Sequence, residues 1–221
     1  MKTVYLHALP GGAHELSLTP LAHLKVANRN QRSFDALADA MPAGELHLVG
    51  FSMGTQAALR LADILGSRVV RVTLASPVVP PILGGVLPKF IGTGGLLGRL
   101  SSGLAAKAVA KPIVAAEPEF FADKDQHRAL VASIQQGLTS NAPAMMRECA
   151  AFEKPWHGCL ERIRCQVSIW QGEDDAFVAP ETASALARHL PYAEVNWCRA
   201  RGHYATLEQT MFALSKHPDL A

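Results

Sequence analysis

The sequence is poor in charge, since charged residues make up only 18% of its 221 residues and the formal net charge is +2. It contains no run of Lys or Arg, which argues against a nucleic-acid-binding surface. Hydrophobic residues make up 49%, so the chain also lies outside the disordered class. This length suits one α/β domain with a substantial core, and we expect residues 1–221 to form that single domain.

Long apolar runs and paired cysteine motifs are also missing. The longest uncharged stretch, residues 72–88, is interrupted by three prolines, so we expect no membrane-spanning helix there. The first nine residues are too short for the apolar part of a secretory signal. The cysteines form no C-x-x-C pair, and we expect buried, reduced thiols of a cytoplasmic protein, with a cysteine nucleophile as the alternative. They are Cys149, Cys159, Cys165 and Cys198.

Motifs for cofactors and metals are absent as well. The loop Pro10-Gly11-Gly12 lacks the G-x-G-x-x-G spacing of a dinucleotide-binding turn. His7 and His14 are not spaced as ligands on one helix face, and no Cys/His cluster accompanies them. We therefore expect neither a cofactor nor a metal.

What the chain does contain is an alternation of strand-like and helix-like segments. The alternation predicts an α/β fold with a doubly wound, mainly parallel sheet of about six strands and helices on both faces. The predicted strands are 3–7, 24–27, 46–51, 69–75, 167–171 and 193–198, and the predicted helices are 33–41, 53–65, 180–190 and 206–214.

Residues 77–164, which we call the inserted segment, interrupt this alternation. Its first part, residues 80–103, is rich in Gly, Pro and Leu and nearly free of charge, and the remainder reads as helices, for example 102–111 and 123–137. An insertion of this length after a strand favours a lid over an apolar pocket, with simple helical padding as the alternative. The partner we expect is a small molecule with an apolar acyl or aromatic part.

The most informative motif is G-F-S-M-G at residues 50–54, a G-x-S-x-G pentapeptide centred on Ser52. A strand-like run precedes it and a helical pattern follows, which is the sequence signature of a nucleophile elbow. The turn is so tight that only glycines fit beside the serine. The Ser52 hydroxyl would then stand above the sheet, at the positive end of a helix, where a nucleophile can act.

A serine nucleophile needs a base, and the base needs an acid that orients it. In a doubly wound sheet both partners should lie on loops after later strands. Asp174 and Asp175 follow the predicted strand 167–171, and His203 follows the predicted strand 193–198. The order Ser, Asp, His along the chain is that of one hydrolase class.

Four motifs spread over the chain resemble those of the α/β-hydrolase fold superfamily: H-A-L-P-G-G, G-F-S-M-G, G-E-D-D-A-F-V-A-P and R-G-H-Y-A-T. The resemblance implies that Ser52 is the nucleophile, Asp175 the acid and His203 the base. It favours Asp175 over Asp174 because the family's acid comes three residues after the glycine. The chain lacks the initial antiparallel strand pair and the D-x-x-G-x-G-x-S turn of similar enzymes, which indicates an N-terminally trimmed version of the fold.

The resemblance also implies an oxyanion hole of two backbone N–H groups, one from the residue after the nucleophile. That residue is Met53. The second donor should come from the loop after the first strand. Pro10 has no N–H, so we expect Leu9, with Ala8 as the alternative. Ala8 also stands where similar proteins have glycine.

Together these features predict a serine hydrolase that cleaves a carboxylic ester or thioester through an acyl-enzyme on Ser52. Enzymatic alternatives with the same triad are C–C bond hydrolysis, acyl transfer and cofactor-free peroxidation. An alternative of another class is a ligand-binding protein with this fold and no turnover. The roles of three further residues stay open. Arg199 and Arg201 either attract a substrate carboxylate or lie at the end of a solvated loop. Trp156 either lines the pocket or belongs to the core.

Overall fold

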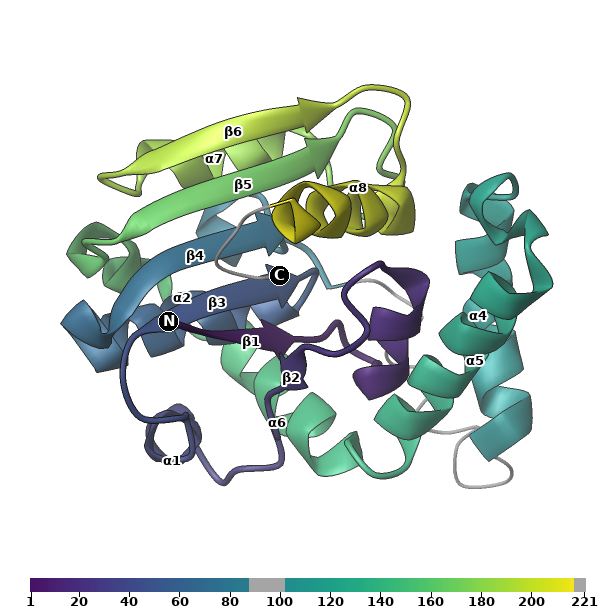
Figure 1. Ribbon diagram of the computed structural model, residues 1–221, viewed down its shortest axis with the longest axis horizontal. Coiled ribbons are helices and arrows are strands. Elements are labelled where there is room, and N and C mark those ends of the chain that lie inside the picture. Colours follow the sequence, from purple (N-terminus) through teal and green to yellow (C-terminus); the bar gives the residue numbers. More distant parts are fainter. Residues whose placement is uncertain (88–101, 217–221) are drawn as a thin grey trace.

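A computed structural model describes residues 1–87 and 102–216, and in it six parallel strands form one sheet (Figure 1). The sheet order is β2-β1-β3-β4-β5-β6, and every neighbouring pair is parallel. The chain changes direction across the sheet between β1 and β3, which is the place where ligands bind in such folds. The strands are β1 (Lys2–Leu6), β2 (Lys25–Val26), β3 (Leu46–Phe51), β4 (Val69–Ala75), β5 (Gln166–Gly172) and β6 (Ala193–Cys198).

Helices cover both faces of the sheet, as predicted. Val4 and Leu6 belong to one core with α1, α2 and α7, whereas Tyr5 belongs to the other core with α4, α5 and α8. This alternation is the two-residue period of a strand that is buried on both sides. The helices are α1 (Phe34–Asp39), α2 (Gly54–Leu65), α4 (Ser102–Ala116), α5 (Lys124–Leu138), α6 (Ala142–Phe152), α7 (Glu181–Arg188) and α8 (His203–Ser215). Short 3-10 helices are η1 (Ala13–Leu18), η2 (Gly66–Arg68), η3 (Pro81–Leu83), η4 (Phe120–Ala122) and η5 (His157–Arg162).

All the predicted strands and helices are present with bounds within two residues of those expected, except for two helices that differ by more. The helix predicted at 102–111 continues to Ala116, because Ile113 on the next turn is buried in the core. The helix predicted at 206–214 already begins at His203, where Glu117 of the inserted segment accepts the N–H groups of its first turn. The second of these differences bears directly on the site.

The inserted segment supplies α4, α5 and α6. Figure 1 shows α4 and α5 beyond the carboxyl ends of the strands, where α5 packs against α4 and η1. Part of the Gly/Leu-rich stretch expected at 80–103 lies outside the described residues. In the two described ranges, no helix combines the length and apolar character that crossing a membrane needs.

Candidate active site

Ser52 lies in the sharp turn between β3 and α2. Its φ is +53°, a conformation that is uncommon for a residue with a side chain and typical of strained functional turns. Two hydrogen bonds fix the turn: Ser52 N–H donates to Ala75 O at 3.0 Å, and Thr55 N–H donates to Ser52 O at 3.1 Å. A Cβ on Gly54 would overlap the carbonyl oxygen of Leu6, so the helix can start this close to β1 only with glycine there. The local geometry is the strand, turn and helix that the pentapeptide predicts.

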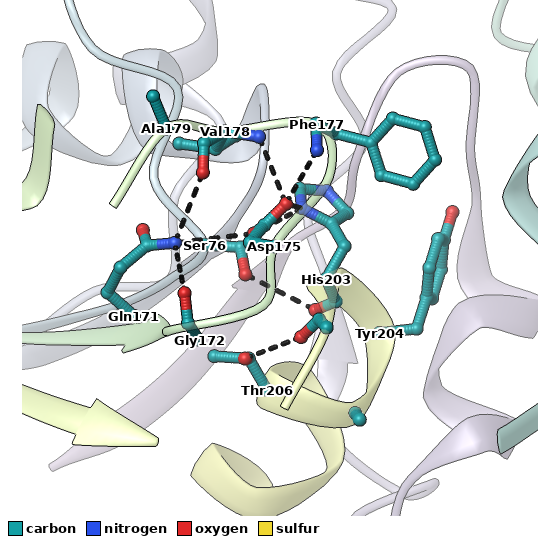
Figure 2. Close-up of polar contacts among 12 residues, drawn as sticks. Ser76, Gln171, Gly172, Asp175, Phe177, Val178, Ala179, His203, Tyr204 and Thr206 are labelled. Carbon is teal, nitrogen blue, oxygen red and sulfur yellow. Dashed lines mark hydrogen bonds and ion pairs between the residues drawn. The ribbon is translucent and has the colours of Figure 1, made fainter. Parts of the chain in front are cut away.

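Asp175 and His203 meet at the carboxyl ends of β5 and β6. His203 Nδ1 lies 2.8 Å from Asp175 Oδ2 and 3.1 Å from Oδ1 (Figure 2). Asp175 Oδ1 also accepts the N–H groups of Phe177 and Val178 at 2.9 and 3.0 Å. The side chain of Asp174, by contrast, is exposed. Of the two adjacent carboxylates, Asp175 is the one that faces the histidine.

The pair is electrostatically coupled. Burial alone would lower the pKa of His203, but the charge and hydrogen bond of Asp175, with smaller contributions from Glu117 and Glu15, raise it above its ordinary value of 6.5. Burial alone would raise the pKa of Asp175, but His203 and the two backbone donors hold it below 3.8. Asp175 is therefore built to stay ionised and to favour the imidazolium form of His203.

Ser52 and His203 line one small cavity between the sheet and α4. Its volume is about 20 Å³, which is room for one water molecule. An acyl group needs more space, so lining side chains must move when a substrate binds. Ile113 of α4 contributes to the lining from the inserted segment. The lining residues are Ala8, Leu9, Pro10, Ser52, Ile113, Phe177, His203 and Tyr204.

Of the two expected oxyanion donors, Leu9 lines this cavity and Met53 directly follows Ser52. Within residues 1–87 and 102–216, the N–H groups of Met53 and Leu9 find no protein acceptor. The N–H of Ala8, by contrast, donates to Glu15 Oε2 at 2.9 Å. Burial raises the pKa of Glu15 to about 7. Ala8 is thus already engaged, and Leu9 stays the candidate for the second donor.

Sequence reasoning missed Arg29, which is buried next to the backbone of His7 and Met53. Its guanidinium donates to the carbonyl of His7, to that of Met53 at 3.4 Å, and to both carboxylate oxygens of Glu148 on α6. Burial, and then the charge of Arg29, lowers the pKa of His7 to about 3, so His7 is neutral. The one available signal was position, because Arg29 follows β2 at the same edge of the sheet as Ser52.

Ser76 was missed as well. It follows β4, has a φ of +44°, and its hydroxyl donates to the carbonyl of His203 at 3.2 Å (Figure 2). The ring of His203 packs against Phe51, with centroids 4.8 Å apart. His203 is thus held at its ring by Asp175 and Phe51, and at its backbone by Ser76.

The remaining candidates do not reach the cavity. Burial raises the pKa of three cysteines to about 11, which argues against a thiolate nucleophile. Cys149 and Cys165 are only half-buried, contrary to expectation. Trp156 belongs to the core, and the side chains of Arg199 and Arg201 are exposed. Among the described residues, no group of three or more His, Cys, Asp or Glu could hold a metal.

Comparisons with known proteins place the chain among proteins of one fold. Residues 6–213 match the sequence profile of the Alpha/beta hydrolase family. No curated protein matches the chain. Among solved structures, it is similar to a thermophilic esterase from Thermogutta terrifontis, with 16% identity, a TM-score of 0.69, and 98% of this chain and 88% of that chain covered.

Two further structures extend this likeness. A bromoperoxidase from Bacillus anthracis is 19% identical, with a TM-score of 0.72 over 97% of this chain and 90% of that chain. A serine hydrolase from the polyaromatic-hydrocarbon-degrading bacterium Cycloclasticus zankles is 17% identical, with a TM-score of 0.68 over 97% of this chain and 87% of that chain. At such identities the likeness concerns the fold alone.

Proposed function

Because the chain belongs to the alpha/beta hydrolase family, we propose that it is a serine hydrolase that cleaves a carboxylic ester or thioester through an acyl-enzyme on Ser52. The observation that carries the proposal is the buried Asp175–His203 pair, in which His203 lines the same cavity as Ser52. A nucleophile, a base and an orienting acid are the groups that acyl transfer to serine requires.

Acylation uses the three side chains together. Ser52 Oγ attacks the carbonyl carbon while His203 Nε2 takes the hydroxyl proton. Asp175 holds the Nδ1–H of His203 and stabilises the imidazolium that forms. The N–H groups of Met53 and Leu9 donate to the developing oxyanion, and each contributes about 3 kcal/mol to transition-state stabilisation. The alcohol or thiol then leaves with the proton from His203.

Deacylation reverses these roles with water. His203 takes a proton from a water molecule, whose oxygen attacks the acyl carbon on Ser52. The tetrahedral intermediate collapses, Ser52 Oγ recovers its proton from His203, and the carboxylic acid is released. The cycle uses only groups of this chain and water, without a cofactor.

The lining of the cavity bears on the substrate. Leu9, Ile113 and Phe177 present apolar surface around Ser52, which favours an apolar acyl or aromatic group over a charged one. We propose that the inserted segment acts as a lid, since Ile113 closes the cavity from α4. The free thiols of all four cysteines fit a reducing compartment, and we propose the cytoplasm as the location.

A fluorophosphonate probe tests the proposal, because it reacts covalently with an activated serine. We expect labelling of the wild type and none of Ser52→Ala, while Ser17→Ala, which removes an exposed hydroxyl, labels like the wild type. An unlabelled wild type would favour a binding protein without turnover. Labelling without hydrolysis of any p-nitrophenyl ester or thioester would favour C–C bond hydrolysis or acyl transfer.

A further inference from the structure

Glu117 lies directly after α4 and reaches the first turn of α8. Its Oε1 accepts Tyr204 N–H at 2.8 Å, and its Oε2 accepts Ala205 N–H at 2.9 Å. These N–H groups have no partner inside the helix, and the residue before α8, Gly202, provides no side-chain cap. A carboxylate at a helix N-terminus satisfies these donors and interacts favourably with the helix dipole. The cap of α8 thus comes from the inserted segment, about ninety residues earlier in the chain.

The chain around Gly202 fits this contact closely. A Cβ on Gly202 would lie 2.5 Å from Cδ of Glu117. The φ of Gly202 is −81°, which any residue can adopt, so its backbone conformation does not require glycine. What the site requires at this position is the absence of a side chain. The glycine of the R-G-H motif therefore leaves room for Glu117 beside the base.

The same turn of α4 closes the cavity. Glu117 N–H donates to Ile113 O at 3.2 Å, and Ile113 lines the cavity with Ser52 and His203. Ile113 and Glu117 are one helical turn apart, so they move together if α4 moves. The same position of α4 therefore both closes the cavity and caps α8.

Glu117 also belongs to the set of charges around the base. Three carboxyl groups act on His203: Asp175 from the loop after β5, Glu117 directly after α4, and Glu15 from η1. Burial raises the pKa of Glu117 above its ordinary value of 4.5. The two backbone N–H donors and His203 lower this pKa, and the charge of Asp175 raises it. Glu119, Asp174 and Arg201 line a neighbouring hollow beside it.

We infer that Glu117 is a positioning residue, which caps α8 at His203 and so couples the seating of α4 over the cavity to the orientation and charge of the base. This inference rests on the proposed function, because it assigns the base role to His203. When α4 is seated, the negative charge of Glu117 favours the imidazolium that forms as Ser52 loses its proton. When α4 moves away, His203 loses both that charge and the cap that fixes its helix.

The test compares Glu117→Gln with Glu119→Gln, an exposed carboxylate two residues away that makes no hydrogen bond to α8 in the described structure. Glu117→Gln removes the charge and one acceptor at nearly constant size. We expect a lower pKa of the His203 ring by NMR titration and an about tenfold loss of kcat/KM on p-nitrophenyl acetate at the pH plateau. Glu119→Gln should match the wild type in both. In Glu117→Asp, which keeps the charge, the pKa of His203 should stay close to its wild-type value.

Gly202→Ala disrupts the same contact without changing Glu117, because the added methyl group displaces the Glu117 side chain. It should lower the pKa of His203, as Glu117→Gln does, and it replaces Glu117→Gln in the test if that variant does not fold. An unchanged His203 titration and unchanged kinetics in these variants would overturn the inference. The NMR titration needs no substrate, so it decides the role of Glu117 even if the wild type fails to react with the fluorophosphonate probe, a result that would contradict only the proposed function.

Discussion

The carboxyl edge of the sheet and the inserted segment both contribute to the site, but they place their residues by different means. Ser52 follows β3 directly, Asp175 comes three residues after β5, and His203 five residues after β6. Parallel register alone brings such residues together. In the inserted segment, Glu117 contacts α8 and Glu148 contacts Arg29. Both contacts join parts of the chain that are far apart in sequence. The candidate catalytic residues thus lie close in sequence to strands, whereas the residues that cover the cavity and surround His203 are placed by tertiary contacts.

The two regions also differ in how they are held. Strand β3, which leads to Ser52, is buried on both faces along its whole length, with Leu46 and Leu48 in one core and Val49 and Phe51 in the other. The inserted segment makes apolar contacts too, but several polar contacts attach it to the loops of the site. Gly12 N–H donates to Ser133 Oγ at 3.0 Å, and Asn141 Nδ2 donates to Gly11 O at 3.0 Å. When one partner of a buried hydrogen bond is removed, the other is left unsatisfied and its full desolvation penalty is lost from stability. Substitutions should therefore change the stability of the two regions differently.

The largest effect is expected at the carboxyl edge. Asp175→Asn should lower kcat on a p-nitrophenyl ester about 10⁴-fold, because the amide cannot hold the correct tautomer of His203 or stabilise its cation. Asp174→Asn is the matched control and should stay near the wild type, since its side chain is exposed. The reverse pattern would move the acid to Asp174.

The next effect concerns the contact between the inserted segment and the loops of the site. Glu148→Gln or Arg29→Ala should lower the free energy of unfolding by about 3–5 kcal/mol, because each leaves an uncompensated group in a fully buried pair. Arg162→Ala breaks the exposed pair with Asp63 and should cost about 1 kcal/mol or less. Denaturant unfolding measures the free energy of unfolding of all three variants. Equal losses of stability would contradict the difference expected between the buried and the exposed ion pair.

These outcomes depend on residues that the sequence reveals to different degrees. Ser52 and Gly54 form a local motif, so the elbow could be predicted from the pentapeptide together with the strand-like and helical patterns on either side of it. The sequence already favours Leu9 over Ala8, but only the structure gives a physical reason, because the Ala8 N–H donates to Glu15. Glu117 gives no local signal, since a glutamate at the end of a helix is usually a solvated side chain. Its partners lie 87 and 88 residues away, and only the fold brings them together.

A smaller effect should separate closure from catalysis. Ile113→Ala enlarges the cavity, so the ratio of kcat/KM for p-nitrophenyl octanoate to that for the acetate should rise about tenfold. Val109→Ala truncates another buried side chain of α4 that does not line the cavity, and it should leave the ratio unchanged. A ratio unaffected by Ile113→Ala would show that α4 does not limit the acyl group.

The smallest effect is a shift in pH dependence. His203 must be neutral to accept the Ser52 proton, so kcat/KM falls when pH drops through its pKa. That pKa is raised, and we expect the midpoint of the acid limb above pH 6.5. Asp175, with its lowered pKa, stays ionised throughout this range. A midpoint at or below 6.5 would contradict the coupling of the base to its carboxylate neighbours.

The central claim is that Ser52 carries the acyl group during turnover. Mass spectrometry of the protein, quenched in acid during hydrolysis of p-nitrophenyl acetate, tests this claim most directly. The account predicts one added acetyl group on the peptide that contains Ser52, and neither acetyl group nor turnover in Ser52→Ala. Turnover at the wild-type rate in Ser52→Ala, or an acetyl group on another residue of the wild type, would contradict it.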